Sequence, residues 1–233
     1  MILLLAGLAV LLYFTPKKQS EADEKTTDSS DFTASFESAL KSIPSEQKEI
    51  FSRLQNGLIK AKAENTEQSW MISANDFLKG ARFVEGEKKG TLYKGAIEGF
   101  EKVLKLNPNN LSAKTNLGAS IVESSSFLGN QPMKGITLLR EVIQKDSNNI
   151  EANLQLGLFS VTSRQFDKAI ERFNRILRID STHIDMYVYL GDTYLTMGDK
   201  LKAIESYENY KTRVKDTLII KDIDQYIKKL KTN

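Results

Sequence analysis

Apolar side chains are spaced for helices through most of this chain. From Asp31 onward they recur every three or four residues, and no stretch alternates between apolar and polar residues as a half-buried strand would. Three of the four prolines, Pro44, Pro108 and Pro132, fall between these periodic stretches, where helices should be interrupted. The pattern therefore predicts an all-α protein.

The first residues depart from this pattern, because they form one unbroken apolar run. Ile2 to Phe14 carry no charge, and Lys17 and Lys18 follow shortly after. As a helix the run would be about 20 Å long, shorter than the ~30 Å hydrocarbon layer of a membrane. It also lacks the preceding basic residues and the following cleavage site of a signal peptide. We expect residues 1–15 to be an uncleaved hydrophobic anchor or signal-anchor, whose true start can lie upstream of Met1.

The charges beside this run bear on the side of the membrane. Lys17 and Lys18 argue for a body in the cytoplasm by the positive-inside rule. Basic residues upstream of Met1 would reverse that orientation. We expect a single-pass anchor with the body on the periplasmic side, against the argument from the two lysines. Residues 16–31 are nearly all polar and predict a flexible linker.

The body of the chain repeats itself at a fixed spacing. Each unit divides into two helices with a turn between them. One step of 34 residues separates three pairs of matching positions: Leu156-Gly157 and Leu190-Gly191, Ala169-Ile170 and Ala203-Ile204, and Phe173 and Tyr207. One step earlier, five extra residues separate the two halves of the pattern, which are Leu117-Gly118 and the group Gly135, Ile136 and Leu139.

This pattern resembles the tetratricopeptide repeat (TPR), which has Leu-Gly in its first helix and a small residue followed by an aromatic in its second. The best match is residues 184–217, with Tyr187, Leu190, Gly191, Tyr194, Gly198, Ala203 and Tyr207. The resemblance predicts repeats over residues 74–217, divided as 74–110, 111–149, 150–183 and 184–217. It implies a right-handed superhelix, an α-solenoid of about three or four helix pairs with a concave groove.

Both ends of such a stack need a cover, because the terminal apolar faces would otherwise meet water. Ile219, Ile223, Ile227 and Leu230 recur at helical spacing after the last repeat, so residues 218–233 are predicted to form a C-terminal capping helix. Apolar residues also recur in 32–73. This stretch is predicted to form N-terminal helices, either a cap or a degenerate repeat.

The resemblance also places a binding surface, since the family lines its groove with the first helix of each repeat. In this chain those positions hold Thr115, Ala119, Val122, Leu154, Leu158, Val161, Val188, Asp192 and Leu195. Family members that clamp acidic chaperone tails use Lys and Asn there, which are absent, so that activity is not expected. Aliphatic residues with acidic flanks favour an extended or helical peptide. The alternative left open is that the aliphatic residues are core of a tightly wound or self-capped stack.

Composition removes most catalytic chemistry. The chain has no cysteine, which excludes thiol catalysis. His183 is its one histidine, so a histidine-based catalytic triad and a histidine-rich metal site would both lack the other residues that they need. No phosphate-binding glycine loop occurs. We predict no catalytic, cofactor or metal site. Lys and Arg exceed Asp and Glu by only three, 33 against 30, and the excess lies in residues 211–233, so no nucleic-acid partner is expected.

The favoured function is a membrane-tethered scaffold for protein–protein interactions, an assembly or adaptor factor that binds a protein or peptide in its groove. The alternative is an accessory or chaperone role in cytochrome c maturation, because the TPR subunit of that system also carries an N-terminal anchor. An enzyme is the interpretation that the sequence favours least.

Overall fold

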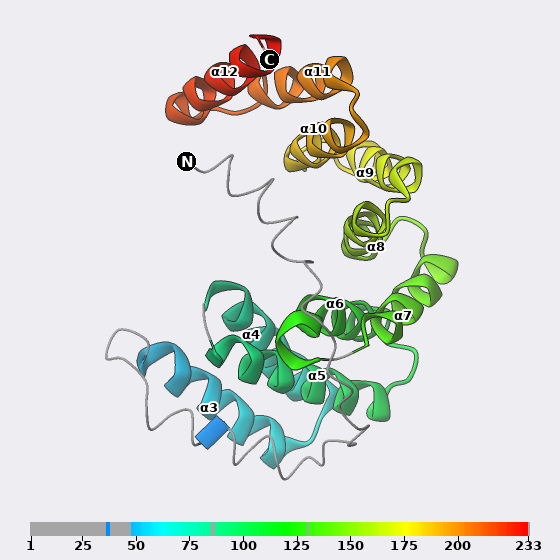
Figure 1. Cartoon of the computed structure of the whole chain (residues 1–233). Coiled ribbons are helices and arrows are strands. Elements are labelled where there is room, and N and C mark those ends of the chain that lie inside the picture. The colour runs from blue at the N-terminus through cyan, green and yellow to red at the C-terminus, as the bar shows by residue number, and fades with distance from the viewer. Residues whose placement is uncertain (1–35, 38–47, 85–86, 130, 233) are drawn as a thin grey trace. The chain divides into compact units, whose positions relative to one another are not determined.

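The computed structural model describes residues 36–37, 48–84, 87–129 and 131–232, which contain helices and no strands (Figure 1). This confirms the predicted all-α class. The predicted anchor, residues 1–15, and the predicted linker, residues 16–31, lie outside the described residues. None of the described helices has both the length and the apolar content to cross a bilayer. The described residues fall into two compact units, here called the N-terminal unit (within Pro16–Val142) and the C-terminal unit (within Ile143–Asn233).

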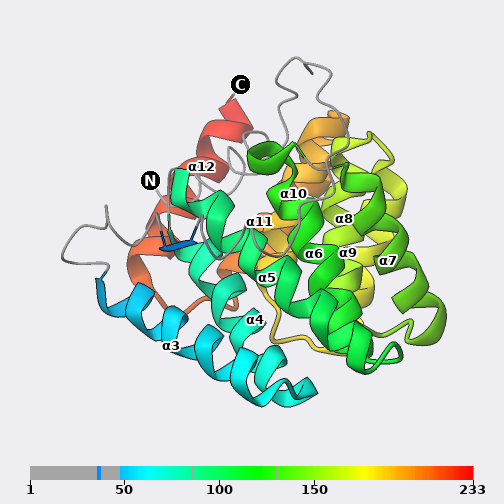
Figure 2. The ribbon, with the colours of Figure 1, turned by 90° about the horizontal axis from the view of Figure 1, so that it is seen from below.

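The N-terminal unit is built from α3 (Lys48–Glu64), α4 (Glu67–Phe83), α5 (Glu87–Leu106), α6 (Leu111–Leu128) and most of α7 (Pro132–Lys145). Consecutive helices from α3 to α6 pack against one another (Figure 2). They share one core of buried side chains, whose largest members with almost no exposed surface are Phe36, Phe51, Leu54, Phe77, Leu92, Tyr93 and Phe100.

Helix α4 begins earlier than the sequence pattern predicted. Thr66 and Ser69 form a capping box: Ser69 N–H donates to Thr66 Oγ1 at 3.1 Å, and Thr66 N–H donates to Ser69 Oγ at 3.2 Å. The predicted start of a repeat at Ala74 therefore lies inside α4. Here the usual glycine of the first helix is Ala74, and the close approach is made by Gly99 of α5. A Cβ on Gly99 would lie 2.7 Å from Ala74 Cβ.

The C-terminal unit holds the last two helix pairs, α8 (Ile150–Thr162) with α9 (Phe166–Ile179) and α10 (Asp185–Met197) with α11 (Lys200–Lys211), followed by α12 (Thr217–Thr232). Each pair closes over a glycine. A Cβ on Gly157 would lie 2.6 Å from the ring of Phe173, and a Cβ on Gly191 would lie 2.6 Å from the ring of Tyr207. The 34-residue spacing of glycine and aromatic residues is therefore a spacing of equivalent helix contacts.

Equivalent turns precede three of the first helices. The side-chain oxygen of the opening residue accepts a hydrogen bond from the backbone N–H two residues further on, at 2.9–3.1 Å, in the turns that begin at Asn107, Asp146 and Asp180. Asn110 and Asn149 then cap α6 and α8 with their side-chain oxygens. The side-chain hydrogen bonds of the turns thus recur from repeat to repeat, and they fix the residue at which the first helix starts.

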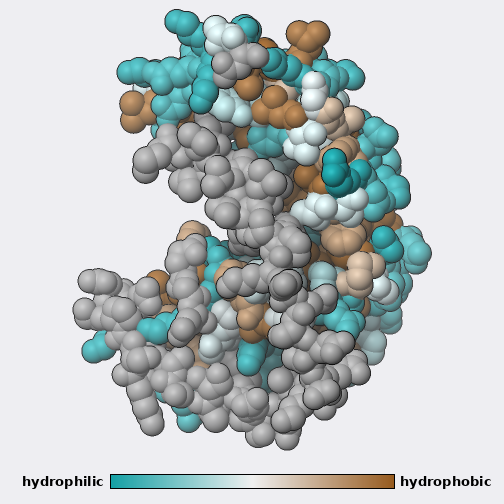
Figure 3. Space-filling view, in the orientation of Figure 1, coloured by the Kyte–Doolittle hydropathy of each residue, from teal (hydrophilic) through white to brown (hydrophobic). Residues whose placement is uncertain are grey.

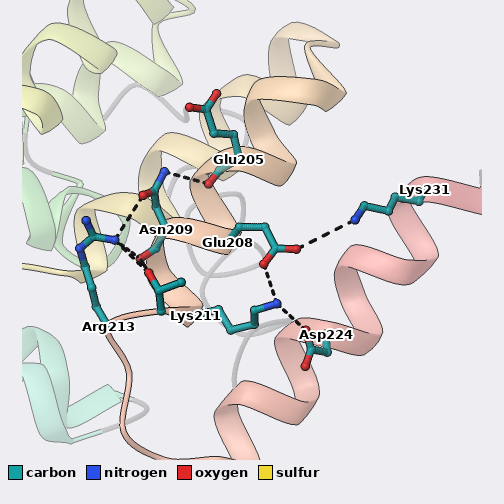
Figure 4. Close-up of polar contacts among 8 residues, drawn as sticks. Glu205, Glu208, Asn209, Lys211, Arg213, Asp224 and Lys231 are labelled. Carbon is teal, nitrogen blue, oxygen red and sulfur yellow. Dashed lines mark hydrogen bonds and ion pairs between the residues drawn. The ribbon is translucent and has the colours of Figure 1, made fainter.

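Helix α12 occupies the residues predicted for the capping helix. It buries Ile223 and Ile227 against Tyr207, Ala203 and Val188. Ion pairs also connect exposed residues of α12 to α11 (Figure 4). Lys211 Nζ lies 2.8 Å from Asp224 Oδ1 and is also paired with Glu208, which Lys231 approaches to 4.0 Å. Because these charges are partly exposed to water, burial of the two isoleucines contributes more to holding α12 than the ion pairs do.

Candidate peptide-binding surface

The nine predicted groove residues come from three first helices: α6 supplies Thr115, Ala119 and Val122, α8 supplies Leu154, Leu158 and Val161, and α10 supplies Val188, Asp192 and Leu195. Helix α6 belongs to the N-terminal unit, while α8 and α10 belong to the C-terminal unit. Side chains of α8 and α10 share one hydrophobic cluster, so these two helices present neighbouring residues.

The three residues on α6 are buried, and the structure leaves them almost no surface for a ligand. Thr115 is 3% exposed, Ala119 0% and Val122 1%. Thr115 Oγ1 donates to the carbonyl of Leu111 at 2.8 Å. Val122 packs closely on Gly135 of α7, since a Cβ added to that glycine would lie 2.9 Å from the Val122 side chain. These three residues are core residues, as in the alternative left open by the sequence. We therefore do not include them in the candidate surface.

Val188 is also a core residue. It belongs to the buried cluster of Ala203, Tyr207, Ile223 and Ile227, and only 7% of its surface is exposed. The cause is α12, which supplies both isoleucines. A position that would face an open groove within a continuing stack is covered here because α12 follows the last pair.

Five predicted residues remain partly exposed: Leu154, Leu158 and Val161 on α8, and Asp192 and Leu195 on α10. The three residues of α8 pack against the cluster that contains Phe173 and Leu190. Leu195 packs against the cluster of α11 and α12. Apolar and polar side chains both reach the surface of the C-terminal unit (Figure 3). We call these five residues the first-helix surface.

Asp192 is the polar member of the first-helix surface. Its Oδ1 accepts a hydrogen bond from the hydroxyl of Tyr207 at 2.6 Å. Burial raises the pKa of Asp192, and the hydrogen bond from Tyr207 opposes that rise only in part. Burial also raises the pKa of Tyr207, and the neighbouring Asp192 carboxylate raises it further. Tyr207 meets the ring of Tyr226 edge-on, with the ring centroids 5.3 Å apart.

Helix α4 also has positions equivalent to the predicted groove residues of α6, α8 and α10. The sequence pattern missed them, because it placed the start of the first repeat at Ala74, inside α4. Gln68 and Met71 lie there and, with Ile72, line a shallow pocket together with Glu67 and Asn110. The Glu67 carboxylate accepts hydrogen bonds from the side-chain amides of Asn110, at 2.7 Å, and Asn107, at 3.1 Å. In the sequence, Thr66 as an N-cap residue type is the signal that marks this helix start.

The described residues hold no group of three or more His, Asp or Glu side chains placed to bind a metal ion. His183 lies in the turn between α9 and α10, where its Nε2 is 3.6 Å from a carboxylate oxygen of Asp180. Asp180 in turn accepts two hydrogen bonds from Thr182, which lower the pKa of its carboxyl group. These contacts shape the turn.

Comparison with known families agrees with this arrangement. Residues 184–211, which cover α10 and α11, match the model of the tetratricopeptide repeat. Tetratricopeptide repeat protein 8 of Caenorhabditis elegans is 25% identical over 120 residues, which are 49% of this chain and 22% of that protein. A probable UDP-N-acetylglucosamine–peptide N-acetylglucosaminyltransferase, SPINDLY of Solanum lycopersicum, is 26% identical over 145 residues, 62% of this chain and 14% of that protein. The matched stretches thus span less than a quarter of either relative.

Solved structures resemble the chain over more of its length. MamA from Desulfovibrio magneticus RS-1, from residue 41 to its end, has a TM-score of 0.56 at 19% identity, over 78% of this chain and 95% of that one. YrrB, described as a TPR protein with an unusual peptide-binding site, has a TM-score of 0.54 at 20% identity, over 83% and 97%. PilW, a type IV pilus biogenesis factor, has a TM-score of 0.53 at 20% identity, over 87% and 84%. These likenesses confirm the predicted TPR-like fold.

Proposed function

We propose that this chain is a TPR scaffold that binds a protein or peptide partner at the first-helix surface of α8 and α10. We propose further that its N-terminal apolar run tethers it to a membrane, with the body on the periplasmic side, where it serves as an assembly or adaptor factor. The two parts have separate support and are tested by separate variants.

The observation that carries the binding proposal is the partial exposure of Leu154, Leu158 and Val161 on one helix. Residues that only fill a core are normally buried completely, as Ala169, Phe173 and Ile176 of the partner helix α9 are, each 0% exposed. Aliphatic side chains that keep part of their surface in water can bury it against a ligand. The fold shared with YrrB, a protein with a peptide-binding site, supports the same use.

The tether rests on sequence alone. Ile2 to Phe14 are apolar, and a membrane anchor raises the local concentration of a scaffold near membrane partners, so that weak contacts suffice. A full-length chain should therefore sediment with membranes, and a chain without residues 2–14 should stay in the supernatant. Equal sedimentation of both forms would contradict the membrane tether, but it would not bear on the proposal that α8 and α10 bind a partner.

The binding surface is tested by Leu158→Lys. A lysine at this half-buried position places a charge where an apolar contact should form, and we expect loss of partner capture in a pull-down from solubilised membranes, with the helical signal in circular dichroism retained. Thr137→Lys is the matched control, because Thr137 is exposed on α7 and receives the same charge. Normal capture by a folded Leu158→Lys, or collapse of its fold, would show that this position is not part of a binding surface.

A further inference from the structure

The carboxyl group of Asp192 has incomplete hydrogen bonding. One oxygen, Oδ1, accepts from Tyr207, while the other, Oδ2, is buried and has no hydrogen-bond partner. In the described part of the chain, no other buried side-chain oxygen or nitrogen is left in this condition. Native proteins satisfy nearly all such atoms, because a buried acceptor without a donor raises the free energy of the folded state. An exception of this kind needs a reason.

The preceding repeat shows that the fold does not require an acid here. Asp192 and Tyr207 correspond, one 34-residue step earlier, to Leu158 and Phe173. Phe173 and Tyr207 are both fully buried, and each packs on the glycine of its own first helix. The earlier pair packs through apolar contact alone, since Leu158 lies against the cluster of Phe173. The last repeat therefore has a polar pair where an apolar pair suffices, at the expense of a desolvated carboxylate.

Departures from local packing rules of this kind concentrate at functional sites. Tyr207 explains only one of the two oxygens, because a phenol hydroxyl has one hydrogen to donate. Within the described residues no side chain or backbone group donates a hydrogen bond to Oδ2. A cationic donor that would satisfy Oδ2 is thus missing from the described part of the chain.

The surroundings fit a cation supplied by a ligand. Asp185 lies two helical turns before Asp192 on α10 and is exposed, and Glu151 holds the same repeat position as Asp185 on α8. Acids therefore accompany the aliphatic residues Leu158 and Leu195, which are half-buried. Such a surface complements a peptide with one basic side chain between apolar ones, because the apolar flanks exclude water and strengthen the ion pair.

We infer that Asp192 is the specificity-determining residue of the first-helix surface and binds an arginine or lysine side chain of the partner peptide. This inference rests on the proposed function and adds the chemistry of the ligand to it. A small rotation of the partly exposed Asp192 carboxylate brings Oδ2 to the surface, where the basic side chain donates to it, while Tyr207 keeps its hydrogen bond to Oδ1. The aliphatic residues contact the apolar neighbours of the basic residue.

The test uses fluorescent nine-residue peptides with leucine and alanine flanks and either arginine or citrulline at the centre. Citrulline has nearly the shape of arginine but carries no charge. Binding to the full-length chain in detergent is measured by fluorescence anisotropy. We expect the arginine peptide to bind at least about tenfold more tightly than the citrulline peptide, since a charged hydrogen bond replaces a neutral one. In Asp192→Asn this ratio should fall to about one.

Asp167→Asn is the matched control, because it removes the same charge from an exposed position of the neighbouring helix α9, outside the first-helix surface. It should keep the preference for arginine. The inference is overturned if the wild-type chain binds both peptides equally, or if Asp192→Asn retains the preference. Failure of the wild-type chain to bind either peptide counts against the proposed binding surface as well, so the two claims fail in different ways. Melting curves of both variants confirm that they are folded.

Discussion

Replacing Gly191 by leucine should unfold the last helix pair, with a loss of about 3 kcal/mol in the free energy of unfolding, the upper part of the usual range for overpacking. The first atom of any side chain at this position would lie 2.6 and 2.7 Å from two ring atoms of Tyr207. The ring cannot move aside, because it is fully buried, meets Tyr226 and donates a hydrogen bond to Asp192. Urea titration followed by circular dichroism measures the loss.

The control for this variant is Gly57→Leu. Gly57 lies inside α3, and a Cβ there would meet nothing within 4 Å. Leucine favours a helix by about 1 kcal/mol over glycine, so this variant should be slightly more stable than the parent chain. Equal stability of Gly191→Leu and the parent would show that α10 and α11 do not approach each other at this glycine, and the repeat register would have to be abandoned.

Removal of α12, residues 217–233, should destabilise the C-terminal unit by about 3–6 kcal/mol and cause aggregation. The estimate counts the burial of two isoleucines, Ile223 and Ile227, at about 1.5–3 kcal/mol each. The truncation would also expose Val188, Tyr207 and their neighbours, which form an apolar patch on the last pair. Size-exclusion chromatography and a thermal melt measure both effects.

A point substitution separates the loss of packing from the loss of chain length. Ile223→Asp puts a charge at a fully buried position of α12, whereas Gln225→Asp puts the same charge at an exposed position two residues away. The first should reproduce most of the effect of the truncation, and the second should behave like the parent chain. A stable, monodisperse truncation would mean that α12 does not act as a cap.

The sequence predicted those parts of the fold that depend on contacts within one repeat. The spacing of Gly157 and Gly191, and of Phe173 and Tyr207, recurs because each glycine accommodates the aromatic ring of its own helix pair. Such contacts are fixed by local spacing and can be found by aligning the chain with itself. The start of α4 was not found this way, because Ala74 stands where the later first helices have glycine and the close approach is made by Gly99 of α5.

The binding surface was harder to predict, because exposure depends on what packs over a repeat. Val188 and Leu154 hold the same repeat position, yet Val188 is buried by α12 while Leu154 remains half-buried. The hydrogen bond between Asp192 and Tyr207 joins residues 15 apart on two helices and has no signature in helical periodicity. One signal was available: both positions change together from Leu158 and Phe173 to Asp192 and Tyr207, from an apolar pair to a polar one.

The central claim, that the first-helix surface holds the partner, is tested most directly by site-specific photo-crosslinking in membranes. The photoreactive amino acid p-benzoylphenylalanine is placed at position 158 in one full-length chain and at position 137 in another, which puts the probe on α8 or on the exposed side of α7. The proposal predicts a discrete covalent adduct from position 158, lost in competition with the arginine peptide, and none from position 137. Adducts from position 137 alone, or from both positions with equal yield, would contradict it.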